Sequence, residues 1–223
     1  MHGPFAWFKW QALFTQWPAF AEGLSVTALT AVLALALALA LGVLFGVINS
    51  SHVKPLKVIG RIYVEVFQNT PLVVQVFFLY NGLPYIGIVL PVFAVGVLGV
   101  GMYHGAYVSE VVRAGIQSIA KGQREAAYSQ GFSFWLTMRH VVLPQAVRVI
   151  LPPLTNQAIF LVKNTSVLAM VAGGDLMYQA DSWAADSLYY GPAYVVTGLL
   201  YLAICFPLSR LAHGLETGTE ARA

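Results

Sequence analysis

The sequence predicts an all-α membrane protein with five transmembrane helices, an amphipathic N-terminal segment and a short helix in a cytoplasmic loop. Of its 223 residues, 58% are hydrophobic and only 9% are charged, and the mean hydropathy is +0.72. A chain of this composition has apolar runs that are too long for a soluble shell to cover. The formal net charge is +3, and in a membrane protein the positions of the charges say more than their sum.

The first 22 residues are expected to lie at the membrane surface rather than across the membrane. They combine Phe and Trp side chains with Lys9 and are interrupted by Pro4 and Pro18, a pattern typical of the headgroup region. They lack the basic start and the small-residue cleavage site of a secretory signal. The transmembrane domain is therefore expected to cover residues 23–211, followed by a cytoplasmic tail at residues 212–223.

Residues 23–48 form the first predicted span. They carry no charge and, at about 1.5 Å per residue, they exceed a hydrocarbon core of ~30 Å. Gly42 and Gly46 are four residues apart, a spacing that permits close approach of two helices. The same spacing is also common by chance in glycine-rich spans, so two interpretations of this pair stay open.

Span two, predicted at residues 58–80, has a polar interruption in its middle. Pro71 removes a backbone donor there and turns Thr70 away from helical angles. A broken helix is therefore predicted, with the break facing protein or a water-filled cavity. The remaining spans are predicted at residues 91–116, 145–168 and 193–211.

The distribution of basic residues predicts the orientation in the membrane. Only Lys9 is expected on the outer side, and Lys163 lies within a span. The linker at residues 173–192, with three Asp and no Lys or Arg, then faces outward, the N-terminus is outside and the C-terminus is in the cytoplasm. The basic residues assigned to the cytoplasmic side are Lys54, Lys57, Arg61, Arg113, Lys121, Arg124, Arg139, Arg148, Arg210 and Arg222.

The polar segment at residues 117–144 has a distinctive spacing. Glu125-Ala126-Ala127 is followed by three residues, Gly131, nine residues and then the sequence V-V-L-P. Gly131 stands where a left-handed residue would end a short helix. Ser133 can N-cap a second segment that runs to Arg139, and Pro144 suits the first turn of the next long helix. A helix–glycine–helix connection is therefore predicted.

This spacing resembles the EAA loop of the membrane subunits of ATP-driven ABC importers, which reads E-A-A, three residues, G, nine residues, I, any residue, L-P. The one departure is Val141 in place of Ile. The stretches at residues 67–75, 105–113 and 162–166 look like the polar amino-acid branch of these permeases. The residues that the resemblance assigns to coupling with an ATPase are Glu125, Ala126, Ala127, Gly131, Leu143 and Pro144.

The resemblance implies a permease subunit in a bacterial inner membrane that translocates polar amino acids. It implies a dimer with an identical or paralogous permease, two cytosolic ATP-binding subunits and an extracytoplasmic amino-acid-binding protein. ATP and Mg²⁺ would bind to the ATPase, because this chain has no phosphate-binding loop, and it is not expected to be an enzyme. Neither a cofactor, a metal site nor a nucleic-acid partner is expected, and membrane lipid surrounds the spans.

An amino acid carries a carboxylate and an ammonium group, and their natural receptors are a lysine, the start of a half-helix and a carboxylate. We expect Lys163 and the backbone N–H groups that follow Pro71 to hold the carboxylate, and Glu110 to hold the ammonium group. Because Asn164 is neutral, a neutral or acidic cargo such as glutamine or glutamate is favoured. The full predicted site is Asn69, Thr70, Leu72, Gln75, Tyr107, Glu110, Lys163, Asn164 and Thr165.

Two other classes of function remain open on the residues alone. An ion-coupled carrier or a channel would use Glu65, Glu110 and His104 as a proton path. His104, on a glycine-rich face, has a second interpretation as a hydrogen-bonding residue between helices. An intramembrane enzyme is disfavoured, because the five histidines are scattered and the single cysteine, Cys205, lies in an apolar segment.

Overall fold

The computed structural model of the chain describes residues 3–51 and 53–220, and the regular structure of these residues is entirely helical. This confirms the predicted all-α fold. Four short π or 3-10 turns, η1 to η4, connect or extend the α-helices at Phe78–Gly82, Leu83–Ile86, Met138–Val142 and Thr165–Val171. The α-helices are α1 (Trp7–Thr15), α2 (Trp17–Ser50), α3 (Lys54–Gln68), α4 (Leu72–Phe77), α5 (Val92–Ser118), α6 (Lys121–Ser129), α7 (Phe134–Thr137), α8 (Leu143–Asn164), α9 (Leu176–Ser187) and α10 (Tyr190–Glu220).

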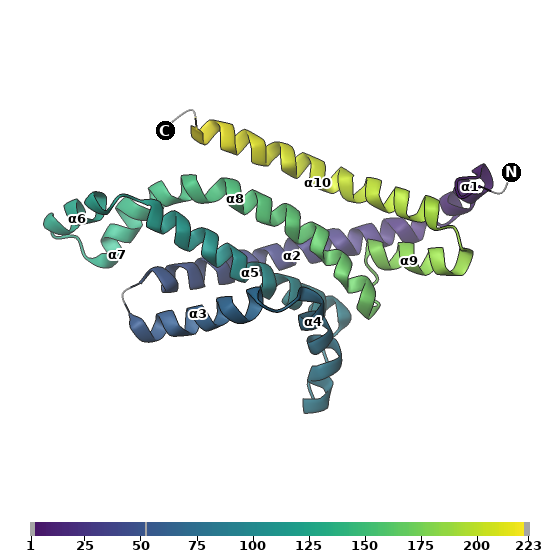
Figure 1. Cartoon of the computed structure of the whole chain (residues 1–223), viewed down its shortest axis with the longest axis horizontal. Coiled ribbons are helices and arrows are strands. Elements are labelled where there is room, and N and C mark those ends of the chain that lie inside the picture. The colour runs from purple at the N-terminus through teal and green to yellow at the C-terminus, as the bar shows by residue number, and fades with distance from the viewer. Residues whose placement is uncertain (1–2, 52, 221–223) are drawn as a thin grey trace.

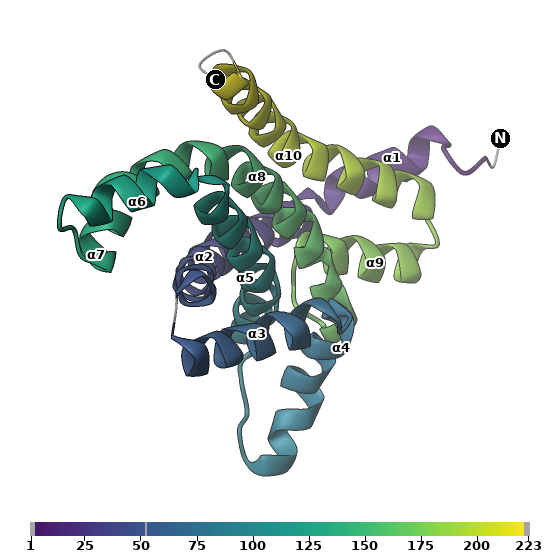
Figure 2. The same ribbon diagram turned by 60° about the vertical axis from the view of Figure 1, so that its left-hand side comes forward.

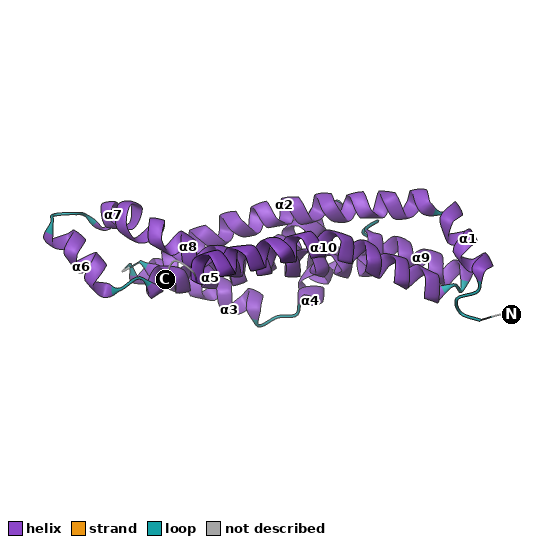
Figure 3. Ribbon diagram, turned by 90° about the horizontal axis from the view of Figure 1, so that it is seen from above, coloured by secondary structure: helices purple, strands orange, loops and turns teal. Residues whose placement is uncertain are grey.

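The long helices α2, α5, α8 and α10 run along the long axis of the molecule (Figure 1). Figure 3 shows α6 and α7 at one end of this bundle and α1 with α9 at the other. The end of α10 lies towards the α6 end, and α4 projects sideways from the bundle (Figures 1 and 2). The polar loop between α5 and α8 and the linker helix α9 are therefore at opposite ends of the protein.

In the described part of the chain, three helices are long and apolar enough to cross a membrane by themselves, namely α2, α5 and α10. Two bent pairs bring the number to five if each pair counts as one span. The first pair joins α3 to α4 and the turns that follow, with a bend of 100°, and the second joins the helical segment Phe134–Val171 to α9, with a bend of 45°. The break before α4 is the one predicted at Pro71.

Several predicted boundaries differ from the observed ones. α2 begins at Trp17 rather than at residue 23, because Pro18 occupies the first turn, where its missing N–H costs nothing. The predicted linker at residues 173–192 contains α9, whose first N–H groups are capped by Asp175. α10 continues to Glu220, so most of the predicted tail is helical, while Arg222 lies outside the described residues.

The central contact of the bundle is between α2 and α5, and it depends on glycine. Gly42 and Gly46 are buried on α2 against Val108 and Val112 of α5. A Cβ atom on Gly46 would lie 2.6 Å from the Cβ of Val112 and 2.9 Å from the Ser109 carbonyl oxygen. The paired glycines are therefore a true helix contact and not a chance spacing.

Gly46→Ala is expected to lower the stability of the assembled permease by about 1–3 kcal/mol, because the added methyl group overlaps backbone and side chain of α5. The matched control is Gly198→Ala in α10, where a new Cβ has no neighbour within 4 Å. That change should be neutral or slightly stabilising, since alanine favours helix. The unfolding temperature of each variant is measured by heating in detergent followed by size-exclusion chromatography. Equal unfolding temperatures for the two variants would contradict the close α2–α5 contact.

Candidate functional site

The polar loop builds a short helix that ends on a glycine. α6 is closed by two hydrogen bonds, from the Phe132 N–H to the Ala127 carbonyl at 3.1 Å and from the Gly131 N–H to the Tyr128 carbonyl at 2.9 Å. These are the two bonds of a Schellman motif. Gly131 has φ of +81°, in the left-handed region that glycine adopts without strain. The helix end predicted at Gly131 is therefore confirmed.

The loop continues directly into the next long helix. Ser133 caps α7 by accepting a hydrogen bond from the Leu136 N–H at 3.4 Å, as predicted. The second segment does not stop at Arg139, however, because η3 joins α7 to α8 without a break. A π turn suits this place, since Pro144 has no N–H and its ring crowds the carbonyl four residues earlier. Leu143 and Pro144 form the first turn of α8.

The coupling residues differ in their exposure. Glu125 is 60% exposed and its carboxylate lies 3.0 Å from the Lys121 ammonium group, a surface pair that contributes little to stability. Ala126 is exposed beside it, whereas Ala127 is buried against the protein. α6 therefore presents Glu125 and Ala126 outward and uses Ala127 to hold the helix in place.

The break at Pro71 is held by side chains that turn back onto the end of α3. The amide of Asn69 donates to the Glu65 carbonyl at 2.8 Å, and the hydroxyl of Thr70 donates to the Val66 carbonyl at 2.7 Å. The amide of Gln75 donates to the Phe67 carbonyl at 3.0 Å and to the Thr70 hydroxyl at 2.8 Å. These bonds satisfy carbonyls that the broken helix leaves free.

A groove of about 500 Å³ opens beside the start of α4. Leu72 of α4 and Asn164 at the end of α8 line it together. Asp181 of α9 contributes a carboxylate, and Ser166 and Met177 form the side shared with a second groove that Lys163 lines. The groove thus joins the start of a half-helix, an amide and a carboxylate, with a lysine next to it.

Lys163 and Thr165, on either side of Asn164, have different surroundings. The Lys163 ammonium group lies 4.9 Å from the centre of the Phe160 ring, a distance typical of a cation–π contact. Thr165 is fully buried, and its hydroxyl donates to the Val162 carbonyl at 2.7 Å. Of these two predicted residues, only Lys163 is available to a ligand.

A buried histidine connects Asn164 to α5. His104 is 2% exposed, with Nε2 3.0 Å from the Asn164 amide nitrogen and Nδ1 3.3 Å from the Gln157 amide oxygen. Tyr103 and Tyr107 lie next to it, with their hydroxyl groups 3.1 Å apart. The structure therefore makes His104 a hydrogen-bonding residue between helices.

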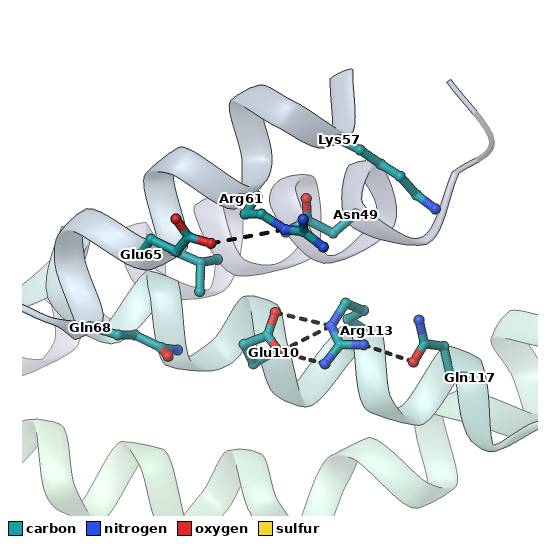
Figure 4. Close-up of a pocket in the computed structure, with 9 residues that line it drawn as sticks. Asn49, Lys57, Arg61, Glu65, Gln68, Glu110, Arg113 and Gln117 are labelled. Carbon is teal, nitrogen blue, oxygen red and sulfur yellow. Dashed lines mark hydrogen bonds and ion pairs between the residues drawn. The ribbon is translucent and has the colours of Figure 1, made fainter. Parts of the chain in front are cut away.

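Glu110 lies elsewhere, in a charged pocket of about 400 Å³ between α3 and α5 (Figure 4). The single N–H of Arg113 Nε is shared between the two carboxylate oxygens of Glu110, each at 3.0 Å, and Arg113 Nη2 donates to one of them at 2.6 Å. Arg61 and Glu65 face this pair from α3, with Nε and Oε1 4.0 Å apart. The other lining residues are Asn49, Lys57, Val64, Gln68 and Gln117.

The structure thus divides the nine predicted substrate residues into separate places. Leu72, Asn164 and, in the adjoining groove, Lys163 come together, whereas Glu110 is absent from the lining of both grooves. Asp181 is a carboxylate of the groove that the sequence did not single out. Its only signal was its position in an acidic linker with no basic residue.

The proton path that an ion-coupled carrier would need, through Glu65, Glu110 and His104, is not continuous among the described residues. Glu65 and Glu110 line the charged pocket, and each is paired with an arginine. His104 does not line that pocket and is bonded instead to two amides of α8.

The family model described as the binding-protein-dependent transport system inner membrane component matches residues 38–220. The chain belongs to this family. The permease is 42% identical over 208 residues to the probable glutamine ABC transporter permease protein GlnM of Bacillus subtilis (strain 168), across 93% of this chain and 96% of that one. It is 34% identical over 211 residues to the glutamine transport system permease protein GlnP of Escherichia coli (strain K12), across 94% and 96%.

Solved structures agree with this assignment. The crystal structure of an amino acid ABC transporter with histidines has a chain that is 33% identical to the permease, with a TM-score of 0.86 over 93% of this chain and 97% of that one. An inward-facing structure of the MetNI methionine ABC transporter is 17% identical with a TM-score of 0.67, which shows a similar fold. The permease is an inner membrane component, and its transport system includes a separate ATPase and a binding protein.

Proposed function

We propose that this permease imports polar amino acids, with the groove between α4, α8 and α9 as the place where the cargo binds. The observation that carries the proposal is the meeting of Leu72 and Asn164 in one groove, with Lys163 beside it. These groups suit the two charges and the polar side chain of an amino acid. The two relatives described above are named as a probable glutamine permease and a glutamine permease, which points to the same class of cargo.

The carboxylate of the cargo would bind at the start of α4 and to Lys163. The first helical N–H groups to bond within α4 are those of Val74 and Gln75, which donate to the Pro71 carbonyl at 3.0 and 3.3 Å. The N–H groups of Leu72 and Val73 therefore remain for an anion, as expected at a helix start. The start of a helix carries a partial positive charge, and Lys163 adds a full positive charge to it.

The ammonium group needs a carboxylate. Glu110 is the residue predicted for this role, but its carboxylate already accepts hydrogen bonds from two nitrogens of Arg113. Asp181 lines the groove itself, which favours it as a second candidate. Asn164 and Tyr107 would contact the cargo side chain, and Asn69, Thr70, Gln75 and Thr165 would shape the site from behind, since their side chains bond to the backbone.

The orientation and the partners are part of the same proposal. The α6–α7 loop would face the cytoplasm and contact one of two ATPase subunits through Glu125 and Ala126, and α9 would face the binding protein. The start of α3, which is rich in basic residues, lies towards the α6 end (Figure 1), which supports this orientation. A second permease subunit, identical or paralogous, would complete the transport domain within the lipid bilayer.

Competition uptake tests the cargo class. The permease, its ATPase and its binding protein are reconstituted in vesicles, and ATP-driven uptake of labelled glutamine is measured against an excess of each common amino acid. Polar amino acids should compete, and branched-chain and aromatic amino acids should not. Competition by apolar amino acids alone, or driven uptake of none of them, would contradict the proposal.

A further inference from the structure

The hydrogen bonds of His104 fix one tautomer of its ring. The Asn164 amide nitrogen can only donate, so the Nε2 atom 3.0 Å away must accept. The Gln157 amide oxygen can only accept, so the Nδ1 atom 3.3 Å away must donate. His104 is therefore neutral with its proton on Nδ1, and both of its nitrogens are used inside the protein.

This arrangement also fixes the direction of the Asn164 amide. One of its two N–H groups donates to His104, and its carbonyl oxygen has no partner among the described side chains. Asn164 lines the groove beside α4. It therefore offers the groove its carbonyl oxygen as a hydrogen-bond acceptor, together with one remaining N–H.

The other polar side chains of the groove offer acceptors too. The hydroxyl proton of Ser166 is donated to the Lys163 carbonyl at 2.8 Å, which leaves only oxygen lone pairs free. Asp181 is a carboxylate, and one of its oxygens already accepts a hydrogen bond from the Tyr194 hydroxyl at 2.6 Å. All three polar side chains that line the groove thus offer it hydrogen-bond acceptors, and the second N–H of Asn164 is the one donor left among them.

We propose that His104 is a positioning residue that turns Asn164 so that the groove selects cargo whose side chain carries N–H donors over cargo with a side-chain carboxylate. A carboxamide matches the row of acceptors, whereas a carboxylate would leave its own oxygens opposite other oxygens without a proton between them. The inference rests on the proposed function, because it takes Asn164 to contact the cargo side chain. Glutamine and glutamate, which differ only in this group, are the natural pair of probes.

The first test is substrate discrimination in the reconstituted importer with ATPase and binding protein. The unmodified protein should prefer glutamine over glutamate. His104→Leu removes both hydrogen-bonding nitrogens, so the KM for glutamine should rise and the preference should fall on the order of tenfold, with the maximal ATP-driven rate unchanged. His104→Gln keeps an acceptor near the place of Nε2 and should retain the preference. A purely structural loss would lower uptake of both amino acids alike.

The second test needs no substitution at His104. The permease chain is labelled with ¹⁵N-histidine, its other four histidines are replaced by glutamine, and it is assembled with its unlabelled partners. The nitrogen resonances then report which ring atom of His104 carries the proton. A proton on Nδ1 supports the inference, and a proton on Nε2 overturns it. An unmodified importer that prefers glutamate, or a well-assembled His104→Leu variant with the original preference, also overturns it. If no amino acid is taken up at all, the proposed function fails, while the tautomer measurement still decides the state of His104.

Discussion

Lys163→Ala is expected to reduce ATP-driven amino-acid uptake by roughly 100-fold while the importer still assembles. An ionisable group is costly at membrane depth, and no carboxylate within the described part of the chain forms an ion pair with Lys163. Its charge is therefore available to the cargo carboxylate, and a lost charge-assisted hydrogen bond costs about 1.5–3 kcal/mol. Uptake in vesicles, normalised to the amount of intact complex, measures the loss.

The matched control is Lys9→Ala, which also removes a lysine in contact with aromatic rings. The Lys9 ammonium group lies 5.1 Å from the Tyr189 ring centre, near the end of the bundle formed by α1 and α9. Its removal should leave uptake unchanged. Uptake by Lys163→Ala equal to that of Lys9→Ala would rule out Lys163 as a ligand of the cargo.

The double variant Glu125→Arg with Gly131→Trp is expected to lose most of the co-purifying ATPase. The first change reverses the exposed charge of α6. The second places a side chain on a backbone with φ of +81°, which costs about 1–2 kcal/mol for any residue but glycine and opens the Schellman motif. Affinity purification of the permease followed by quantification of the bound ATPase measures the loss.

Gly122→Ala is the control for the change at Gly131. Neither glycine has a neighbour within 4 Å of a built Cβ, but only Gly131 has a positive φ. Gly122→Ala should therefore keep the ATPase. If the double variant retains as much ATPase as Gly122→Ala does, the contact with the ATPase does not run through α6.

Much of the fold could be predicted because the membrane imposes simple rules on the sequence. Uncharged runs mark α2, α5 and α10, Pro71 marks the break between α3 and α4, and Gly131 marks the end of α6. Each of these signals is local, since it depends on the length of an apolar run or on the backbone angles of one residue. α9 was missed because its length and mixed composition are those of an ordinary linker.

Contacts between distant residues could not be predicted in the same way. α2 has no polar face, so its hydropathy does not show which side meets α5, and only Gly42 and Gly46 mark that side. His104 and Asn164 are 60 residues apart, and their bond depends on how α5 and α8 are rotated about their axes.

The same limit applies to the charges of the site. Glu110 was assigned to the cargo from its depth in a span, yet Arg113, one turn later, holds it at 2.6 Å. Asp181 lines the groove from α9, which follows a bend of 45° in the chain. A sequence shows which charges are costly in a membrane, but the helix packing decides which of them are already paired.

The most direct test of the account is labelled-glutamine flux into vesicles that contain the permease with and without its ATPase, with the binding protein supplied outside. The account predicts no flux from the permease alone or with a non-hydrolysable ATP analogue, and accumulation against a gradient once the ATPase and ATP are present. Flux through the permease in the absence of the ATPase would contradict it.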